Sequence, residues 1–113
     1  MDGNFFNYSV MSALGTEFTL NINLKPIDGF HMEDYDFECE FFVFAGKSVI
    51  IKKEDMTKVD EDNYTTVLEQ EDALKLGKGQ VKAMVTAYIP DTNYSDDVRI
   101  EKKLFVCNGV ISN

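Results

Sequence analysis

The chain has 113 residues, of which 44% are hydrophobic, and this length and composition fit one domain with its own hydrophobic core. Its 20 acidic residues outnumber its 11 basic residues, which gives a net charge of −9 at pH 7. A surface of that sign repels nucleic acid and anionic lipid, and no apolar run approaches the ~20 residues of a membrane-spanning helix. Neither nucleic acid nor membrane is therefore expected as a partner. Since the N-terminus lacks the pattern of a signal peptide, Cys39 and Cys107 are expected to be buried free thiols in a protein made in the cytoplasm.

Alternating apolar and polar residues predict a series of short strands. They cover residues 17–25, 35–44, 48–53, 63–69, 79–90 and 98–108, with a last short run at 109–112. The one helix candidate lies near residues 70–76, where Gly77 is placed to end it. This pattern predicts an all-β fold, an antiparallel Ig-like β-sandwich of about seven strands over residues 17–113. Residues 1–16 are predicted to form an N-terminal arm.

The residue types that carry common enzyme chemistry are scarce in this sequence. His31 is the single histidine, and no nucleophile signature such as Gly-x-Ser-x-Gly accompanies it. One histidine and two distant cysteines do not make a zinc site, and the "GKGQ" stretch lacks the spacing of a phosphate-binding loop. We therefore expect no enzyme, no catalytic residue, no cofactor and no bound metal.

The stretch "AYIPDTNYSDDVRIEKKL" (87–104) places an acidic loop between two predicted strands. Pro90 removes a hydrogen-bond donor at the end of the first strand, and Asp91 is suited to cap the turn with its side chain. The loop also offers Asn93, Asp96 and Asp97 as oxygen ligands, but it lacks the frame of an EF-hand. A calcium- or carbohydrate-binding β-sandwich that uses this loop together with Tyr88 and Tyr94 is therefore kept as an alternative function.

Two further features suggest a contact surface. Six acids and no lysine or arginine lie between residues 28 and 40, and an acidic edge of this kind can dock a basic partner. Phe42 and Phe44 fall on the strand face that also carries acids, and three further aromatics lie in the predicted arm. Either the arm folds back over these two phenylalanines or a neighbouring subunit covers them. The predicted interface residues are Phe5, Phe6, Tyr8, Asp36, Glu38, Glu40, Phe42, Phe44 and Tyr94.

Two stretches of the second half, "VIIKKEDMTKVDEDNYTTVLE" and "LGKGQVKAMVTAYIPDTNYSDDVRIE", resemble small virion structural proteins of tailed bacteriophages and prophages of gut Bacteroidales. The shared features are a lysine-rich strand, a "VD-DNY" turn, an "LGKG" connection and an acidic aromatic loop after Ile-Pro-Asp. The resemblance covers residues 48–101 well and 17–44 loosely. The strand plan is also similar to the N-terminal Ig-like module of phage baseplate upper proteins, which continues into a helical or receptor-binding region that has no counterpart here.

The resemblance implies a non-enzymatic component of a tail, baseplate, portal region or capsid lattice. Its expected partners are other virion proteins, with several copies in one assembly, and its expected location is the virion after assembly in the bacterial host cytoplasm. The net charge alone also leaves open an acidic inhibitor that mimics nucleic acid.

Overall fold

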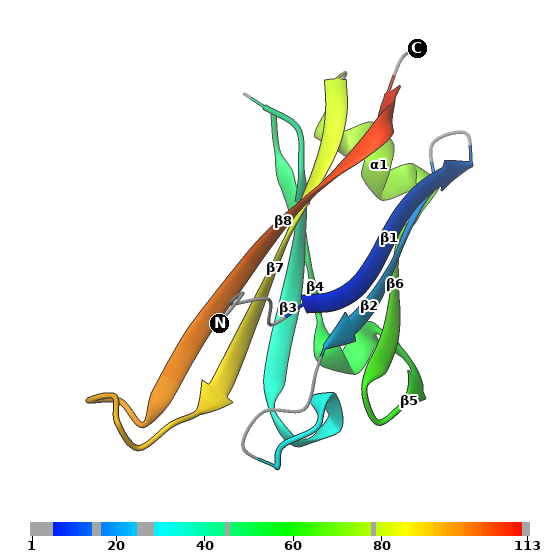
Figure 1. The fold of residues 1–113 in the computed structure, drawn as a ribbon. Helices are drawn as coiled ribbons and strands as arrows, with labels where there is room; N and C mark the ends of the chain where they lie inside the picture. The colour runs from blue at the N-terminus through cyan, green and yellow to red at the C-terminus, as the bar shows by residue number, and fades with distance from the viewer. Residues whose placement is uncertain (1–5, 15–16, 25–28, 45, 78, 112–113) are drawn as a thin grey trace.

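Two antiparallel sheets of four strands each face one another in the computed structural model, which describes residues 6–14, 17–24, 29–44, 46–77 and 79–111 (Figure 1). Side chains are described for these residues except in 6–14 and 107–111. The strands are β1 (Phe6–Leu14), β2 (Glu17–Leu24), β3 (Asp36–Phe42), β4 (Ser48–Lys52), β5 (Thr57–Asp60), β6 (Asn63–Leu68), β7 (Gly79–Pro90) and β8 (Val98–Ile111). The helix α1 (Gln70–Leu76) and the 3-10 turns η1 (Met32–Asp34) and η2 (Lys53–Asp55) complete the elements.

The strand order matches that of an immunoglobulin-like sandwich. One sheet has the order β1-β2-β6-β5 and the other has the order β4-β3-β7-β8. These correspond to the ABED and C′CFG sheets of that architecture. The predicted Ig-like β-sandwich with one short helix near residues 70–76 is confirmed. Residues 6–14, predicted as part of an arm, instead form β1 and pair with β2 along its whole length.

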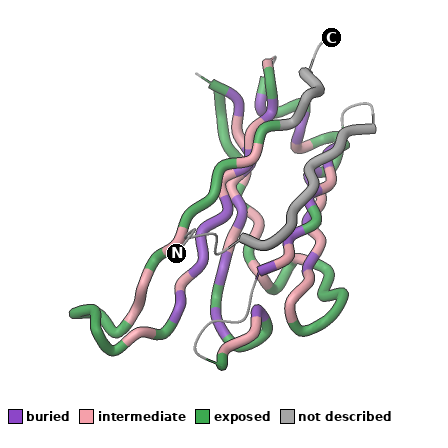
Figure 2. The backbone as a smooth tube through the Cα atoms, in the orientation of Figure 1, coloured by how far each residue is buried: buried purple, intermediate pink, exposed green. Residues whose placement is uncertain are grey.

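The core lies between the sheets because alternate residues of each strand point inward. Phe18, Leu20, Ile22 and Leu24 of β2 are buried, and they face a second set contributed mainly by β3 and β7 (Figure 2). Aromatic side chains from both sheets meet in this core, where the rings of Phe37 and Tyr64 pack edge to face with centroids 4.9 Å apart. The buried inward residues on the second sheet are Phe37, Cys39, Phe41, Val81, Ala83, Val85, Ala87 and Ile89.

Two glycines shape the end of the sandwich near α1. Gly77 ends the helix with a φ of 96°, as its place in the sequence predicted. Gly46 donates its backbone N–H to the Val43 carbonyl at 3.0 Å. A Cβ at residue 46 would collide with the Val43 side chain and lie 2.6 Å from the Leu76 carbonyl oxygen, so only glycine fits there.

The β7–β8 hairpin is the longest feature of the fold, and in Figure 1 its tip lies away from the β1-β2-β6-β5 sheet. The inward side of β8 near the tip carries Arg99, Glu101 and Lys103, which pair with Ile89, Ala87 and Val85 of β7. All three charged residues keep some solvent exposure. Arg99 and Glu101 are tolerated here because they are paired: the Arg99 guanidinium lies 3.3 Å from an Asp91 carboxylate oxygen and 3.1 Å from a Glu101 carboxylate oxygen.

Candidate functional site

The solvent-facing side of the β4-β3-β7-β8 sheet, called the outer face below, is defined by the register of its strands. Residues directly opposite each other in a ladder share a face, so the ladder partners of the exposed and half-buried β3 residues lie on the same side of the sheet as those residues. Thr86, in the middle of this side, is covered by its neighbours and is buried. One row across the sheet joins Ile50, Glu40, Met84 and Leu104. The outer face comprises Asp36, Glu38, Glu40 and Phe42 of β3, Ser48, Ile50 and Lys52 of β4, Lys82, Met84, Thr86 and Tyr88 of β7, and Val98, Ile100, Lys102, Leu104 and Val106 of β8.

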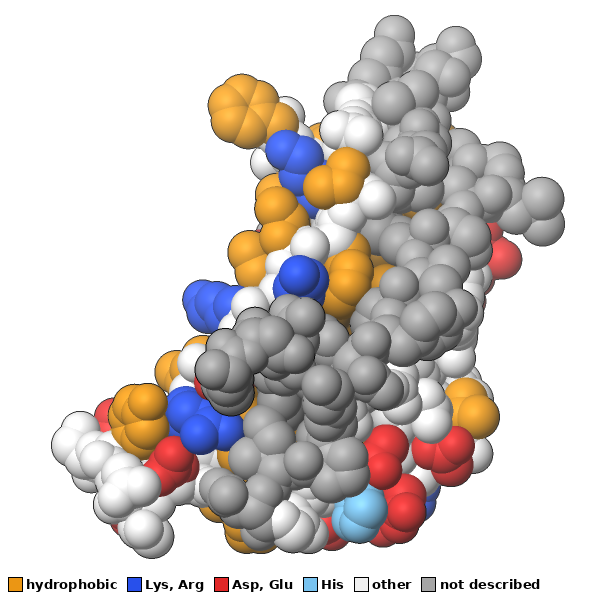
Figure 3. Space-filling view, in the orientation of Figure 1, with side chains coloured by type: hydrophobic (Ala, Val, Ile, Leu, Met, Phe, Trp, Pro, Cys, Tyr) orange, Lys and Arg blue, Asp and Glu red, His pale blue; other side chains and the backbone are white. Residues whose placement is uncertain are grey.

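Large hydrophobic side chains are exposed on this face. Ile50, Ile100, Leu104 and Val106 are 52%, 55%, 44% and 48% exposed, and Phe44 just beyond β3 is 86% exposed. Figure 3 shows hydrophobic and basic side chains interspersed along the side of the molecule that β8 follows. Single exposed apolar residues are normal on a protein surface, but a group on one sheet face is typical of a contact surface.

The predicted interface residues fall into three groups. Asp36, Glu38 and Glu40 lie on the outer face beside a half-buried Phe42, as the strand pattern predicted. Tyr94 is exposed at the tip of the β7–β8 hairpin, apart from this group. Phe5 and the side chains of Phe6 and Tyr8 lie outside the described residues.

The position of strand β1 bears on which of the two alternatives covers Phe42 and Phe44. Residues 6–14 belong to the β1-β2-β6-β5 sheet, whereas both phenylalanines belong to the opposite sheet or its end. Strand β1 therefore does not lie over the outer face. Among residues 6–14, the folded-back arm does not occur, and the alternative of a neighbouring subunit remains a proposal.

The loop at residues 91–97 is built as a turn by Asp91. Its carboxylate accepts the Asn93 backbone N–H at 3.0 Å and the Arg99 guanidinium at 3.3 Å. Its backbone N–H donates to the Asp97 carbonyl at 3.0 Å, which closes the hairpin. The predicted capping role of Asp91 is confirmed, and these contacts explain the aspartate at this position without a ligand.

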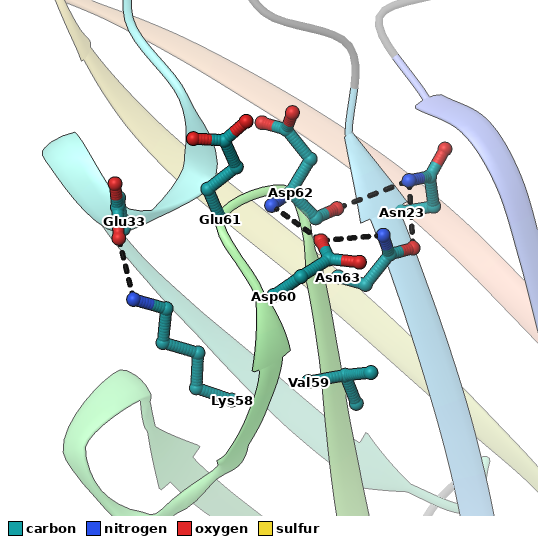
Figure 4. A pocket seen from close by; sticks show the side chains of 8 residues that line it. All are labelled: Asn23, Glu33, Lys58, Val59, Asp60, Glu61, Asp62 and Asn63. Carbon is teal, nitrogen blue, oxygen red and sulfur yellow. Dashed lines mark hydrogen bonds and ion pairs between the residues drawn. The ribbon is translucent and has the colours of Figure 1, made fainter.

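An acidic end of the sandwich forms where η1 meets the β5–β6 turn (Figure 4). Asp60 accepts the backbone N–H of Asp62 at 2.9 Å, and this hydrogen bond is the main reason why the Asp60 pKa lies below its ordinary value. Lys58 reaches across to Glu33, and that contact raises the pKa of the lysine. An open pocket of about 710 Å³ lies between these groups and is lined by Asn23, Glu33, Lys58, Val59, Asp60, Glu61, Asp62 and Asn63.

His31 belongs to this acidic end and was predicted to be a solvated loop residue. Its Nδ1 lies 2.9 Å from an Asp62 carboxylate oxygen and 3.8 Å from a Glu61 oxygen. The hydrogen bond to Asp62 raises the His31 pKa above 6.5, and the nearby carboxylates add to that rise. The sequence did not reveal this pairing, because the two residues are far apart along the chain and no local pattern joins them.

The same three side chains bring possible metal-ligand atoms within 4.8 Å of one another. Both carboxylate oxygens of Asp62 already have partners within the protein. One lies 2.9 Å from His31 Nδ1, and the other accepts the Met32 backbone N–H at 3.2 Å. We interpret the group as a structural tie between the β2–β3 connection and the β5–β6 turn. The recorded partners of His31 are carboxylates and not a hydroxyl or thiol that it could activate.

Comparison with known proteins gives no match to any family model, curated protein or solved structure. In the part of the chain that is described, no helix has the length and apolar character needed to cross a bilayer. The motifs behind the phage resemblance lie where elements end: "VD-DNY" runs from the end of β5 to the start of β6, "LGKG" runs from the last residue of α1 to the first residue of β7, and Ile-Pro-Asp ends β7.

Proposed function

We propose that this protein is a non-enzymatic virion structural protein of a tailed bacteriophage or prophage and that it acts through protein–protein contacts. The observation that carries the proposal is the group of exposed apolar side chains on the outer face. Four of these, Ile50, Ile100, Leu104 and Val106, come from the two edge strands of one sheet. Interfaces combine apolar groups of this kind with a charged rim, which Asp36 and Lys52 supply here.

The acidic end provides a second surface with a different chemistry. Glu33, Asp60, Glu61 and Asp62 concentrate negative charge in a chain that already carries −9, and only Lys58 opposes them within the pocket. A charged patch selects and orients a partner of opposite sign more than it strengthens binding. A basic surface on another virion protein fits this end, and two chemically distinct surfaces suit a component that joins neighbours in an assembly.

The virion assignment is supported by the resemblance at residues 48–101, which concerns turns and strand plan and brings no active site with it. The protein would be made in the bacterial host cytoplasm and retained in the particle in several copies. Mass spectrometry of purified particles, induced from a strain that carries the gene, tests this directly. The protein should be present in fixed ratio to the major structural proteins, and its absence from intact particles would overturn the virion assignment.

A second candidate function uses the hairpin loop. A pocket of about 450 Å³ beside it is lined by Phe30, Pro90, Asp91, Thr92, Asn93 and Asp97. An aromatic ring next to amide and carboxylate groups is an arrangement that can bind a sugar. Glycan-array binding that is lost in Phe30→Ala would favour this function. A shift of the melting temperature at millimolar calcium would favour its metal-binding version.

A further inference from the structure

We propose that the outer face pairs two copies of this chain, so that the unit that enters the assembly is a dimer. This inference rests on the proposed function, because it names the partner of the same surface. The partner is a second copy of this chain and not a foreign protein, because the charges on the face balance.

The outer face is electrically neutral in a strongly acidic chain. Three lysines, Lys52, Lys82 and Lys102, match three acids on the face, Asp36, Glu38 and Glu40. The lysines come from β4, β7 and β8, whereas the acids all come from β3, so the two signs occupy different strands.

This arrangement favours self-association. Two copies with a net charge of −9 each repel one another, and contact is least opposed where the charges of the facing surfaces cancel. Lys52 already pairs with Glu38 of the same chain at 2.9 Å. Lys82 and Lys102 lie on other strands than Asp36 and Glu40, so a copy that is turned over can place these two lysines near those acids of its partner. A basic foreign protein would instead be drawn to the acidic end.

The apolar groups lie where such a pairing would bury them. Ile50 at one edge and Leu104 at the other belong to the same row, with Glu40 and Met84 between them. Val106 and Phe42 continue the apolar area in the next row, on either side of Lys82. Apolar side chains therefore reach both edges of the sheet, with Glu40 and Lys82 among them, and can meet the same side chains on a second copy.

The edge of β8 is a rival contact, since its described neighbour in the sheet is β7 alone. Natural edge strands are protected by lysines and by charged side chains that point inward. Strand β8 has both, with Lys102 on the outer face and Glu101 and Lys103 on the inward side. The edge of β8 is thus protected against pairing with a strand of another molecule. In the described part of the chain, nothing comparable keeps a second molecule from packing on the exposed Ile100 and Leu104 of the outer face.

Sedimentation velocity of the full chain tests the inference, over about 1 to 200 µM, the range in which interfaces of modest area associate. The wild-type protein should sediment as a dimer at the upper concentrations. Leu104→Glu should weaken the dimer tenfold or more, and Ile50→Glu on the opposite edge should do the same. Leu74→Glu is the matched control, because Leu74 is 49% exposed on α1, outside this face. Circular dichroism melts verify that each variant is folded.

Two results would overturn the inference. One is a wild-type monomer throughout the concentration range. The other is a dimer whose dissociation constant is the same in Leu104→Glu and Ile50→Glu as in the control Leu74→Glu. Neither result would contradict the virion assignment, which depends on the presence of the protein in particles. Conversely, a dimer broken by both outer-face variants but absent from particles would retain the pairing and overturn the proposed function.

Discussion

The Nδ1 atom of His31 lies 2.9 Å from a carboxylate oxygen of Asp62, and this contact joins the connection between the two sheets to the β5–β6 turn. The side chain of His31 remains one third exposed, so solvent reaches the pair. Because the contact favours the protonated imidazole, it makes the stability of the fold depend on pH.

His31→Asn should remove a pH-dependent part of the stability. The His31 pKa is raised in the folded protein by its hydrogen bond to Asp62, so the folded state holds the proton more tightly than the unfolded chain does. The stabilisation is therefore complete below the ordinary pKa of about 6.5 and is lost as the pH rises through the raised value. The wild-type melting temperature should fall relative to that of His31→Asn as the pH increases across this window. Asp62→Asn should behave like His31→Asn, and parallel curves for all three proteins would contradict the tie.

Asp91→Ala should loosen the β7–β8 hairpin more than Asp91→Asn does. Both changes weaken the ion pair with Arg99, but an asparagine oxygen can still accept the Asn93 backbone N–H. We expect a cost of about 1 kcal/mol for a lost turn cap and less for the ion pair alone. Hydrogen exchange at residues 91–97 measures the loosening. Equal exchange rates in the two variants would show that the side-chain cap does not hold the loop.

Gly46→Ala should destabilise the fold by about 1–3 kcal/mol, the usual cost of forcing extra volume into a packed site. The added methyl group would collide with Val43 and with the Leu76 carbonyl. Urea unfolding gives the free energy of unfolding. Lys47→Ala is the control, because Lys47 is exposed and its recorded contact to Leu76 is made by its backbone. A Gly46→Ala protein as stable as Lys47→Ala would show that this corner is not tightly packed.

Cys39 should be inert towards thiol reagents while the protein is folded. It is buried in β3, and burial is the main reason why its pKa rises to about 12, so almost no thiolate is present near neutral pH. In a Cys107→Ser background Cys39 is the single thiol of the chain. Labelling with a chromogenic disulfide should be slow in buffer and rapid in urea, and fast labelling in buffer would contradict the burial.

Most of the sandwich was predictable because alternation is a local signal. Strands β2, β3 and β7 bury every second residue, and their apolar periodicity is visible in the sequence. Strand β5 could not be found in this way, because all four of its residues are exposed and no apolar pattern marks it. Strand β1 was missed although Phe6, Tyr8 and Val10 alternate with polar residues, because these aromatics were interpreted as part of an arm.

The candidate site was predicted only in part, for a related reason. The acids and Phe42 of β3 were assigned to one face from their spacing along a single strand. Their neighbours Ile50, Met84 and Leu104 come from three other strands, and the pairing of those strands is a long-range property. The acidic end depends likewise on the approach of η1 to a turn about 30 residues away.

The β7–β8 hairpin also bears on the order of events in folding. Pro90 pairs with Val98 across one short loop, whereas Phe18 must find Leu68 across about half of the chain. Closing a short loop costs less chain entropy and occurs sooner. We therefore expect the hairpin to form early, before the long-range β2–β6 and β3–β7 pairings that complete the two sheets.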